Sequence, residues 1–268
     1  MSDIATTSVY FYGVVHGEHS GPMAGVTPID GEGQVYGITH RELTVIVSDA
    51  RKERYEVSRQ HVRGHEAVVT ALMEGYNVLP ARFGSVRSRD EIVDELLVAY
   101  YETLQAQLKR VEGMIEVSLI VRWSNVQPIV AEIVAADPWL RSARRRLVTA
   151  RASQNLRLDV GKRIELSLAA KRLAEAAEII SALKSYVPPD GVRSNDHGEE
   201  AKVLDSSFLV SRDKIDAFTE AVRVYDSSFD GRYLMVVGTP TAPYGFVPLL
   251  EAAFPRKERV RPRDRGRR

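Results

Sequence analysis

The chain has 268 residues, no cysteine and a formal net charge of +1. The lack of cysteine excludes disulfides, thiolate zinc sites, iron–sulfur clusters and cysteine nucleophiles. No apolar stretch approaches about 18 residues, and the start has no basic segment followed by an apolar one. We therefore expect neither a transmembrane helix nor a secretory signal, and the length leaves room for two domains.

Patterns typical of strands and helices alternate through residues 1–124. The order is β-β-β-α-β-α-β, which indicates an α+β domain resembling a ferredoxin-like layer. Ser58 is expected to cap the first helix, and Ser88 with Glu91 forms a capping box for the second. The expected strands cover 8–15, 35–39, 43–48, 78–86 and 115–123, and the expected helices cover 58–75 and 88–112.

Residues 125–248 have a mainly helical character before a last β-α-β unit at 203–239. Leu166, Leu173 and Ile180 recur every seven residues, which predicts a seam for another helix. The simplest arrangement is an antiparallel hairpin of 139–157 against 158–185. We therefore predict a second α+β domain with a long helical hairpin over 125–248.

The last segment, 249–268, is expected to be a basic, disordered tail. Residues 255–268 hold eight basic and two acidic side chains with very few apolar ones. Two interpretations stay open: an electrostatic arm for an acidic partner, or a segment that only improves solubility.

Motifs of enzymes and cofactor sites are missing from the sequence. It contains no P-loop, no dinucleotide fingerprint, no G-x-S-x-G elbow, no H-E-x-x-H and no kinase signature. We therefore expect no enzymatic activity, no catalytic residue, no cofactor and no metal. The best candidate metal ligands are His61 and His65, four residues apart on a helix, but His65 falls on the apolar face. A hydrogen-bonded core histidine is the favoured interpretation.

Arg82 stands in an otherwise apolar segment and would need a partner if buried. Glu116 is our first choice, and a structural ion pair is favoured over a binding or catalytic cluster. A small-molecule enzyme with a cleft between the domains is a further hypothesis, which would need two titratable groups within hydrogen-bonding reach.

Arginines at 141, 144, 145 and 151 predict a broad basic helix face. Such a face either contacts phosphates or is simply solvated. Together with the tail, it supports an alternative function, a nucleic-acid-binding α+β protein.

Several segments together resemble the GvpF/GvpL family of gas vesicle proteins over residues 8–248. The most specific are the Leu-Pro-Ala-Arg-Phe-Gly-Ser-Val run at 79–86 and the Pro-Tyr-Gly-Phe-Val run at 243–247. Weaker similarity comes from SVYFYGVV at 8–15, from His65 in its helix and from the strand that contains Glu116. Ser85 departs from the family's usual threonine, and the ending lacks its tighter proline-rich run.

The resemblance implies an accessory or minor structural protein of gas vesicle assembly, cytoplasmic and associated with gas vesicles. The implied partner is the hydrophobic shell protein GvpA, whose aggregation it would limit during vesicle nucleation, and other accessory Gvp proteins are further candidates. Neither a membrane nor a small-molecule substrate is implied. The family-motif residues, with a structural or partner-binding role, are Pro80, Arg82, Phe83, Gly84, Glu116, Pro243, Tyr244 and Phe246.

Overall fold

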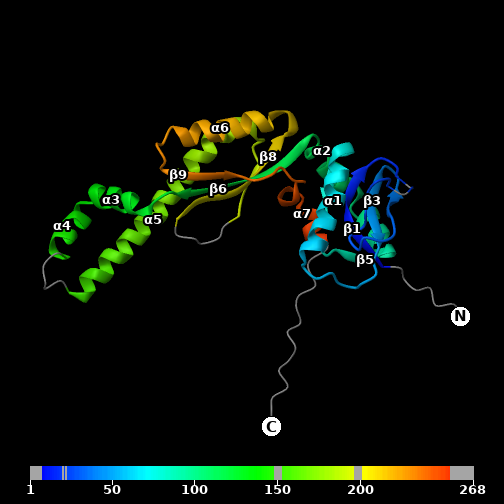
Figure 1. The fold of residues 1–268 in the computed structure, drawn as a ribbon, viewed down its shortest axis with the longest axis horizontal. Coiled ribbons are helices and arrows are strands. Elements are labelled where there is room, and N and C mark those ends of the chain that lie inside the picture. The colour runs from blue at the N-terminus through cyan, green and yellow to red at the C-terminus, as the bar shows by residue number, and fades with distance from the viewer. Residues whose placement is uncertain (1–7, 20, 22, 148–152, 196–200, 254–268) are drawn as a thin grey trace, which may run out of the picture. The chain divides into compact units, whose positions relative to one another are not determined.

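A computed structural model describes residues 8–19, 21, 23–147, 153–195 and 201–253. They form two compact units (Figure 1). The first unit comprises the described parts of Met1–Met114 and Thr241–Arg268, and the second comprises those of Ile115–Pro240. Both units combine helices with a sheet, which confirms the α+β class.

The first unit is built on a sheet of strand order β2-β3-β1-β4, with β5 also paired to β1. Its elements are β1 (Ser8–His16), β2 (Val35–His40), β3 (Leu43–Asp49), α1 (Arg59–Gly75), β4 (Val78–Pro80), β5 (Val86–Ser88), the π-helical segment η1 (Glu91–Val98), α2 (Tyr101–Arg110), the 3-10 turn η4 (Tyr244–Phe246) and α7 (Pro248–Ala253).

Strand β1 is buried on both faces, as its β-branched and aromatic sequence predicts. Tyr10 and Tyr12 pack into a cluster that contains Val69 and Leu72 of α1. Phe11 lies in the other cluster, together with buried side chains of η1 and α2. The predicted caps are also present, since Ser58 accepts the His61 N–H and the Ser88–Glu91 capping box forms in both directions.

The chain returns to the first unit after residue 240. Val247 and Leu250 are buried among the residues of η1 and α2, and Ala242 is buried on the α1 side. The segment 249–253, which we expected to begin a disordered tail, therefore belongs to a packed helix. The rest of that tail, 254–268, lies outside the described residues.

The second unit has a sheet of order β7-β8-β6-β9. Its elements are β6 (Met114–Trp123), α3 (Val126–Ala136), α4 (Pro138–Leu147), α5 (Gln154–Leu183), the 3-10 turn η2 (Lys184–Tyr186), β7 (Val192–Ser194), β8 (Lys202–Ser211), the 3-10 turn η3 (Arg212–Lys214), α6 (Ile215–Ser227) and β9 (Tyr233–Val237).

The ferredoxin-like β-α-β-β-α-β order occurs in the second unit, with α3 to α5 as its first helical layer and α6 as its second helix. The first unit instead has three strands before its first helix. The difference arises from β6, which we expected at the end of a domain closing at residue 124. It pairs with β9 instead, placing Ile120 opposite Val236, so the units divide at residue 114.

The helical segment of the second unit is long, as expected, but it packs through another face. Helix α5 buries Leu156, Leu168 and Ile179, whereas Leu166 and Leu173 are 72% and 73% exposed. At 3.6 residues per turn Leu166 lies about 160° around the helix axis from the buried Leu168, so the seven-residue leucine row and the buried row occupy different faces. The predicted seam is therefore not a contact within the described chain. The helix also begins at Gln154, not at 158.

None of the described helices is both long and apolar enough to cross a membrane.

Candidate functional site

The two most specific sequence motifs meet in the first unit around a buried histidine, His65. The Gly84 N–H donates to the Tyr10 hydroxyl at 2.9 Å. That hydroxyl lies 3.0 Å from His65 Nδ1, and His65 Nε2 lies 3.2 Å from the hydroxyl of Tyr244. The Arg-Phe-Gly turn and the Pro-Tyr-Gly-Phe ending are thus joined through α1 and β1.

One proton arrangement satisfies every group of this chain of contacts. Tyr10 accepts from Gly84 and donates its proton to Nδ1, so Nε2 carries the imidazole proton and donates to Tyr244. Burial lowers the pKa of His65 to about 4, partly opposed by a hydrogen bond with the backbone of Ala81. Burial likewise raises the pKa of Tyr10. Both groups are neutral at pH 7, as a structural contact requires.

The Arg-Phe-Gly turn connects β4 to β5. Gly84 has a φ of +85°, a left-handed conformation that suits glycine, and the Phe83 ring lies 6.0 Å from the imidazole of His65. Pro80 ends β4 opposite Gly13. Arg82 is exposed in the turn. The expectation of an arginine within an apolar strand is therefore wrong, because the strand ends at Pro80.

The segment 243–247 is attached to the first unit by one backbone hydrogen bond and by the buried side chain of Phe246. Pro243 precedes η4, and Phe246 is fully buried. Arg110 of α2 donates from Nη1 to the Phe246 carbonyl at 3.3 Å. Together with Tyr244, these contacts fasten the C-terminal segment to the first unit.

Glu116 is not part of this cluster. It lies in β6 of the second unit. Its pairing with Arg82 therefore stays a prediction, and the burial argument that motivated it no longer applies.

His65 is the hydrogen-bonded core histidine that the sequence favours. His61, one turn earlier, places Nδ1 3.0 Å from the carbonyl of Glu56. Among the residues that the structure describes, no group of three or more histidine, aspartate or glutamate side chains is arranged to hold a metal.

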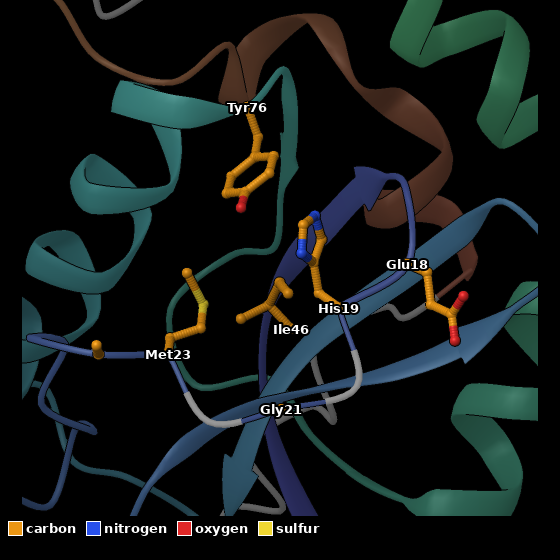
Figure 2. Close-up of a pocket in the computed structure, with 7 residues that line it drawn as sticks. Glu18, His19, Gly21, Met23, Ile46 and Tyr76 are labelled. Carbon is orange, nitrogen blue, oxygen red and sulfur yellow. The ribbon is translucent and has the colours of Figure 1, made fainter.

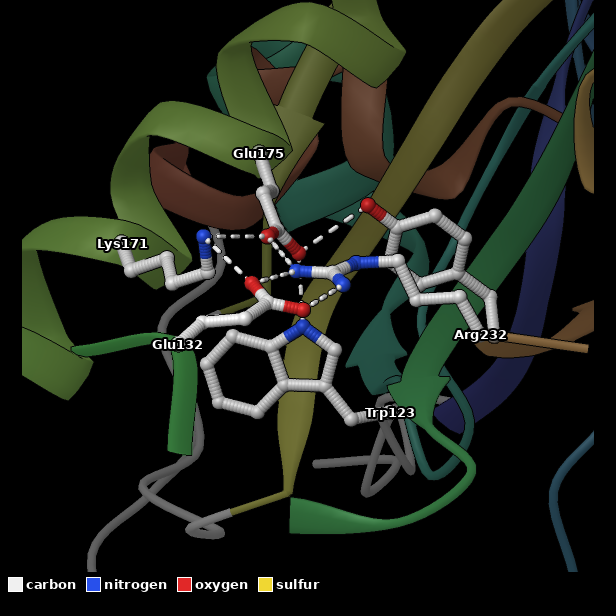
Figure 3. A network of polar contacts seen from close by, with 6 residues as sticks. Trp123, Glu132, Lys171, Glu175 and Arg232 are labelled. Carbon is white, nitrogen blue, oxygen red and sulfur yellow. Dashed lines mark hydrogen bonds and ion pairs between the residues drawn. The ribbon is translucent and has the colours of Figure 1, made fainter. Parts of the chain in front are cut away.

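A second polar cluster, which sequence analysis missed, lies in the second unit (Figure 3). The carboxylate of Glu175 on α5 is buried and accepts hydrogen bonds from Trp123 Nε1 at 2.6 Å and Tyr233 at 3.0 Å. Arg232 donates to Glu175 at 2.6 Å and binds Glu132 with two hydrogen bonds at 2.6 and 3.0 Å. These contacts join α3 and α5 to β6 and to the start of β9.

The charges of this cluster balance one another. Lys171 lies 3.0 Å from Glu132 and 3.5 Å from Glu175, so two cations face two carboxylates. The hydrogen bonds from Arg232 lower the pKa of Glu132 to about 2. Burial opposes ionisation of Glu175, but hydrogen bonds from Arg232, Trp123 and Tyr233 outweigh it and lower its pKa as well. Every member has a partner, which indicates a structural network.

The first unit contains an open hollow (Figure 2). It measures about 500 Å³, and Glu18, His19, Met23, Ile46 and Tyr76 are among its lining residues. The rings of His19 and Tyr76 contact each other at 4.5 Å, and Glu18 extends away from them. All its lining residues belong to the first unit, so it does not test the hypothesis of an enzyme with a cleft between the domains.

A family model described as gas vesicle synthesis protein GvpL/GvpF matches residues 8–248. The chain belongs to this family. Gas vesicle protein F of Dolichospermum flosaquae is 28% identical over 211 residues, 78% of this chain and 85% of that protein. Gas vesicle protein F of Streptomyces sp. (strain CB03234) is 27% identical over 248 residues, which cover 90% and 99% of the two chains.

A solved structure has the same fold. The crystal structure of the gas vesicle protein GvpF from Anabaena sp. PCC7120 superimposes with a TM-score of 0.79 at 24% identity, covering 90% of this chain and 98% of the other. Membership of the GvpL/GvpF family supports a role associated with gas vesicles.

The surface of this GvpL/GvpF family member carries an apolar row on α5, formed by Leu158, Leu166 and Leu173. Their exposed fractions are 56%, 72% and 73%. Arginines at 141, 144 and 145 of α4 are also exposed, but Arg151 and the basic tail lie outside the described residues. The nucleic-acid hypothesis therefore stays untested.

Proposed function

We propose that the chain is an accessory or minor structural protein of gas vesicle assembly that binds the hydrophobic shell protein GvpA and limits its aggregation during nucleation. Family membership supports the association with gas vesicles. The observation that carries the finer proposal is the leucine row of α5, which exposes aliphatic side chains along a 30-residue helix. Cytoplasmic localisation and binding of other accessory Gvp proteins belong to the same proposal.

The leucine row has the geometry that an amphipathic partner helix needs. Leu166 and Leu173 are two turns apart on one face, and the small Ala169 and Ala170 between them are also exposed. A partner helix lying along the row would bury these side chains, and complete burial of one leucine contributes about 1.5–3 kcal/mol. Such a contact would cover apolar surface of the shell subunit before assembly.

A sheet edge offers a second way to cover a shell subunit, by strand addition. The candidate edges are those of the hairpin at 35–48 and of the segment 78–86, both of which the sequence predicts as strands. Strand β2 is the outer strand of the hairpin and has six residues, whereas β4 has only three, all buried. Of the two edges, β2 is the longer and is the one that supports the proposal, although the Met23 N–H already donates to the Val35 carbonyl at one end of it.

The test is capture of co-expressed GvpA by the variant Leu166→Lys/Leu173→Lys. We expect capture to fall about 10-fold, because two charges would enter an apolar contact. Val57→Lys is the matched control, since Val57 is 82% exposed in the first unit and outside the row. Equal capture by both variants and the unmodified chain would refute binding through α5.

A further inference from the structure

Strand β9 is an edge strand with an unprotected outer side. It ends the order β7-β8-β6-β9 and pairs only with β6 among the described residues. Its sequence, Tyr233–Val237, reads YLMVV and contains neither a charge nor a proline. Natural proteins usually protect such edges with charges, prolines, bulges or covering segments.

The hydrogen bonds to β6 show which backbone groups of β9 point outward. Gly238 N–H donates to the Ser118 carbonyl, and Ser124 N–H donates to the Arg232 carbonyl. The residues next to β9 that bond to the β6 side, 232 and 238, are therefore both even-numbered. In an antiparallel ladder the bonding residues alternate, so residues 234 and 236 also face β6. The N–H and carbonyl groups of Tyr233, Met235 and Val237 therefore point away from the sheet.

Side chains on both faces of this edge are apolar. Leu234 and Val236 lie on the face opposite to the buried Tyr233 and are 58% and 56% exposed. On the helix side, the Phe229 ring contacts Tyr233 at 5.3 Å and is itself partly exposed. The outer edge of β9 thus has unpaired backbone groups, with apolar side chains on both faces of the strand.

We propose that a second copy of this chain pairs with this edge, β9 to β9 in antiparallel orientation, to form one continuous sheet across a twofold axis at Met235. In this register Met235 faces Met235 of the other copy, and Tyr233 faces Val237. All six outward-pointing residues of the two strands then form hydrogen-bonded pairs.

The strand is complementary to itself in this register. Leu234 of one copy lies opposite Val236 of the other, a pairing of aliphatic side chains across neighbouring strands. Arg232, which precedes the strand, lies opposite Gly238 of the other copy. The Arg232 side chains of the two copies are therefore at opposite ends of the paired strands. Arg232 is also neutralised within its own chain by Glu132 and Glu175. No like charges meet, which favours a second copy as the occupant.

Sedimentation velocity of the full chain over a concentration series tests the proposal. We expect a monomer–dimer equilibrium, with the dissociation constant raised about 100-fold in Leu234→Lys/Val236→Lys, because the introduced lysines of the two copies would face one another across the paired strands. Val224→Lys is the matched control. It is 53% exposed on α6, on a helix face away from the buried Phe218 and Val222, and should leave the equilibrium unchanged.

A second variant tests the backbone contact directly. Met235→Pro removes an N–H that points outward and is not used in the ladder with β6, so circular dichroism and the melting transition should stay close to those of the unmodified chain. Its dimer should be lost. A chain that remains monomeric at all concentrations, or folded Lys and Pro variants that dimerise as well as the unmodified chain, would overturn the proposal.

Discussion

At the scale of single residues, His65 connects three segments that are far apart in the sequence. Its two ring nitrogens contact Tyr10 of β1 and Tyr244 near the C-terminus, and Tyr10 also accepts from Gly84. A buried imidazole with both nitrogens satisfied fixes its tautomer and its neighbours. Through His65 and Tyr10, the Arg-Phe-Gly and Pro-Tyr-Gly-Phe segments are therefore parts of one hydrogen-bonded group.

Removing the hydroxyl of Tyr244 tests this connection. Tyr244→Phe removes one acceptor of the His65 Nε2–H, which keeps its hydrogen bond with the backbone of Ala81, so we expect a loss of about 0.5–1.5 kcal/mol in the free energy of unfolding. Tyr100→Phe, at an exposed position, should change it by less than about 0.5 kcal/mol. Urea unfolding measures both, and equal stability of the two variants would contradict the assigned bond.

The depressed pKa of His65 predicts a pH dependence of stability. In the unfolded chain this histidine takes up a proton as the pH falls through about 6.5, whereas in the folded chain it does so only near 4. Its contribution is therefore complete above pH 6.5 and is lost toward pH 4, by an amount on the order of 3 kcal/mol. Urea unfolding at pH 6.5 and at pH 4 measures this loss. We expect it in the unmodified chain and not in His65→Gln. Parallel curves would contradict it.

Sequence reasoning identified these residues but not their partners. The helical spacing placed His65 on the buried face of α1, and the motifs marked Gly84 and Tyr244. Nothing local in the sequence indicates that residue 244 lies beside residue 65, because that contact depends on the path of the whole chain. For Arg82 the error was one of element length, since the strand stops at Pro80 and leaves the arginine exposed.

At the scale of elements, the network around Glu175 holds α3 and α5 against the sheet of the second unit. Glu175→Gln removes the charge that Arg232 and Lys171 face, so we expect the second unit to lose about 3 kcal/mol of unfolding free energy. Glu220→Gln is the control, because the Glu220–Arg223 pair is exposed on α6 and should be nearly neutral. Thermal melts of the two variants at pH 7 should differ clearly, and indistinguishable melts would show that the network is not stabilising.

Local sequence patterns predicted individual helices and strands well, but they did not predict which elements pack or pair with one another. The alternation of apolar and polar residues over 115–123 identified β6 and its buried side. The structure adds that Asp137, which follows α3, accepts hydrogen bonds from the first N–H groups of α4. The sheet to which β6 belongs depends on β9, more than a hundred residues later, and was assigned to the wrong half. The leucines of α5 have the spacing of a seam, but spacing does not reveal whether the matching helix lies in the same chain.

At the scale of the whole chain, the second unit is inserted between Met114 and Thr241 of the first. This organisation predicts that residues 115–240 fold alone. A fragment ending at residue 114 lacks the buried Phe246, Val247 and Leu250, and this should cost it more than about 4 kcal/mol. Circular dichroism and thermal melts of the two fragments test this. A cooperative, native-like transition in the 1–114 fragment would contradict it.

The proposed recognition of the shell protein GvpA by apolar contacts of the folded body can be tested directly. The most direct measurement is capture of co-expressed GvpA by the full chain and by residues 1–254, each in low and high salt. We predict equal capture by both forms that persists in high salt, because apolar contacts are not screened. Capture that disappears with the tail or with added salt would make the interaction electrostatic and would contradict recognition through apolar contacts.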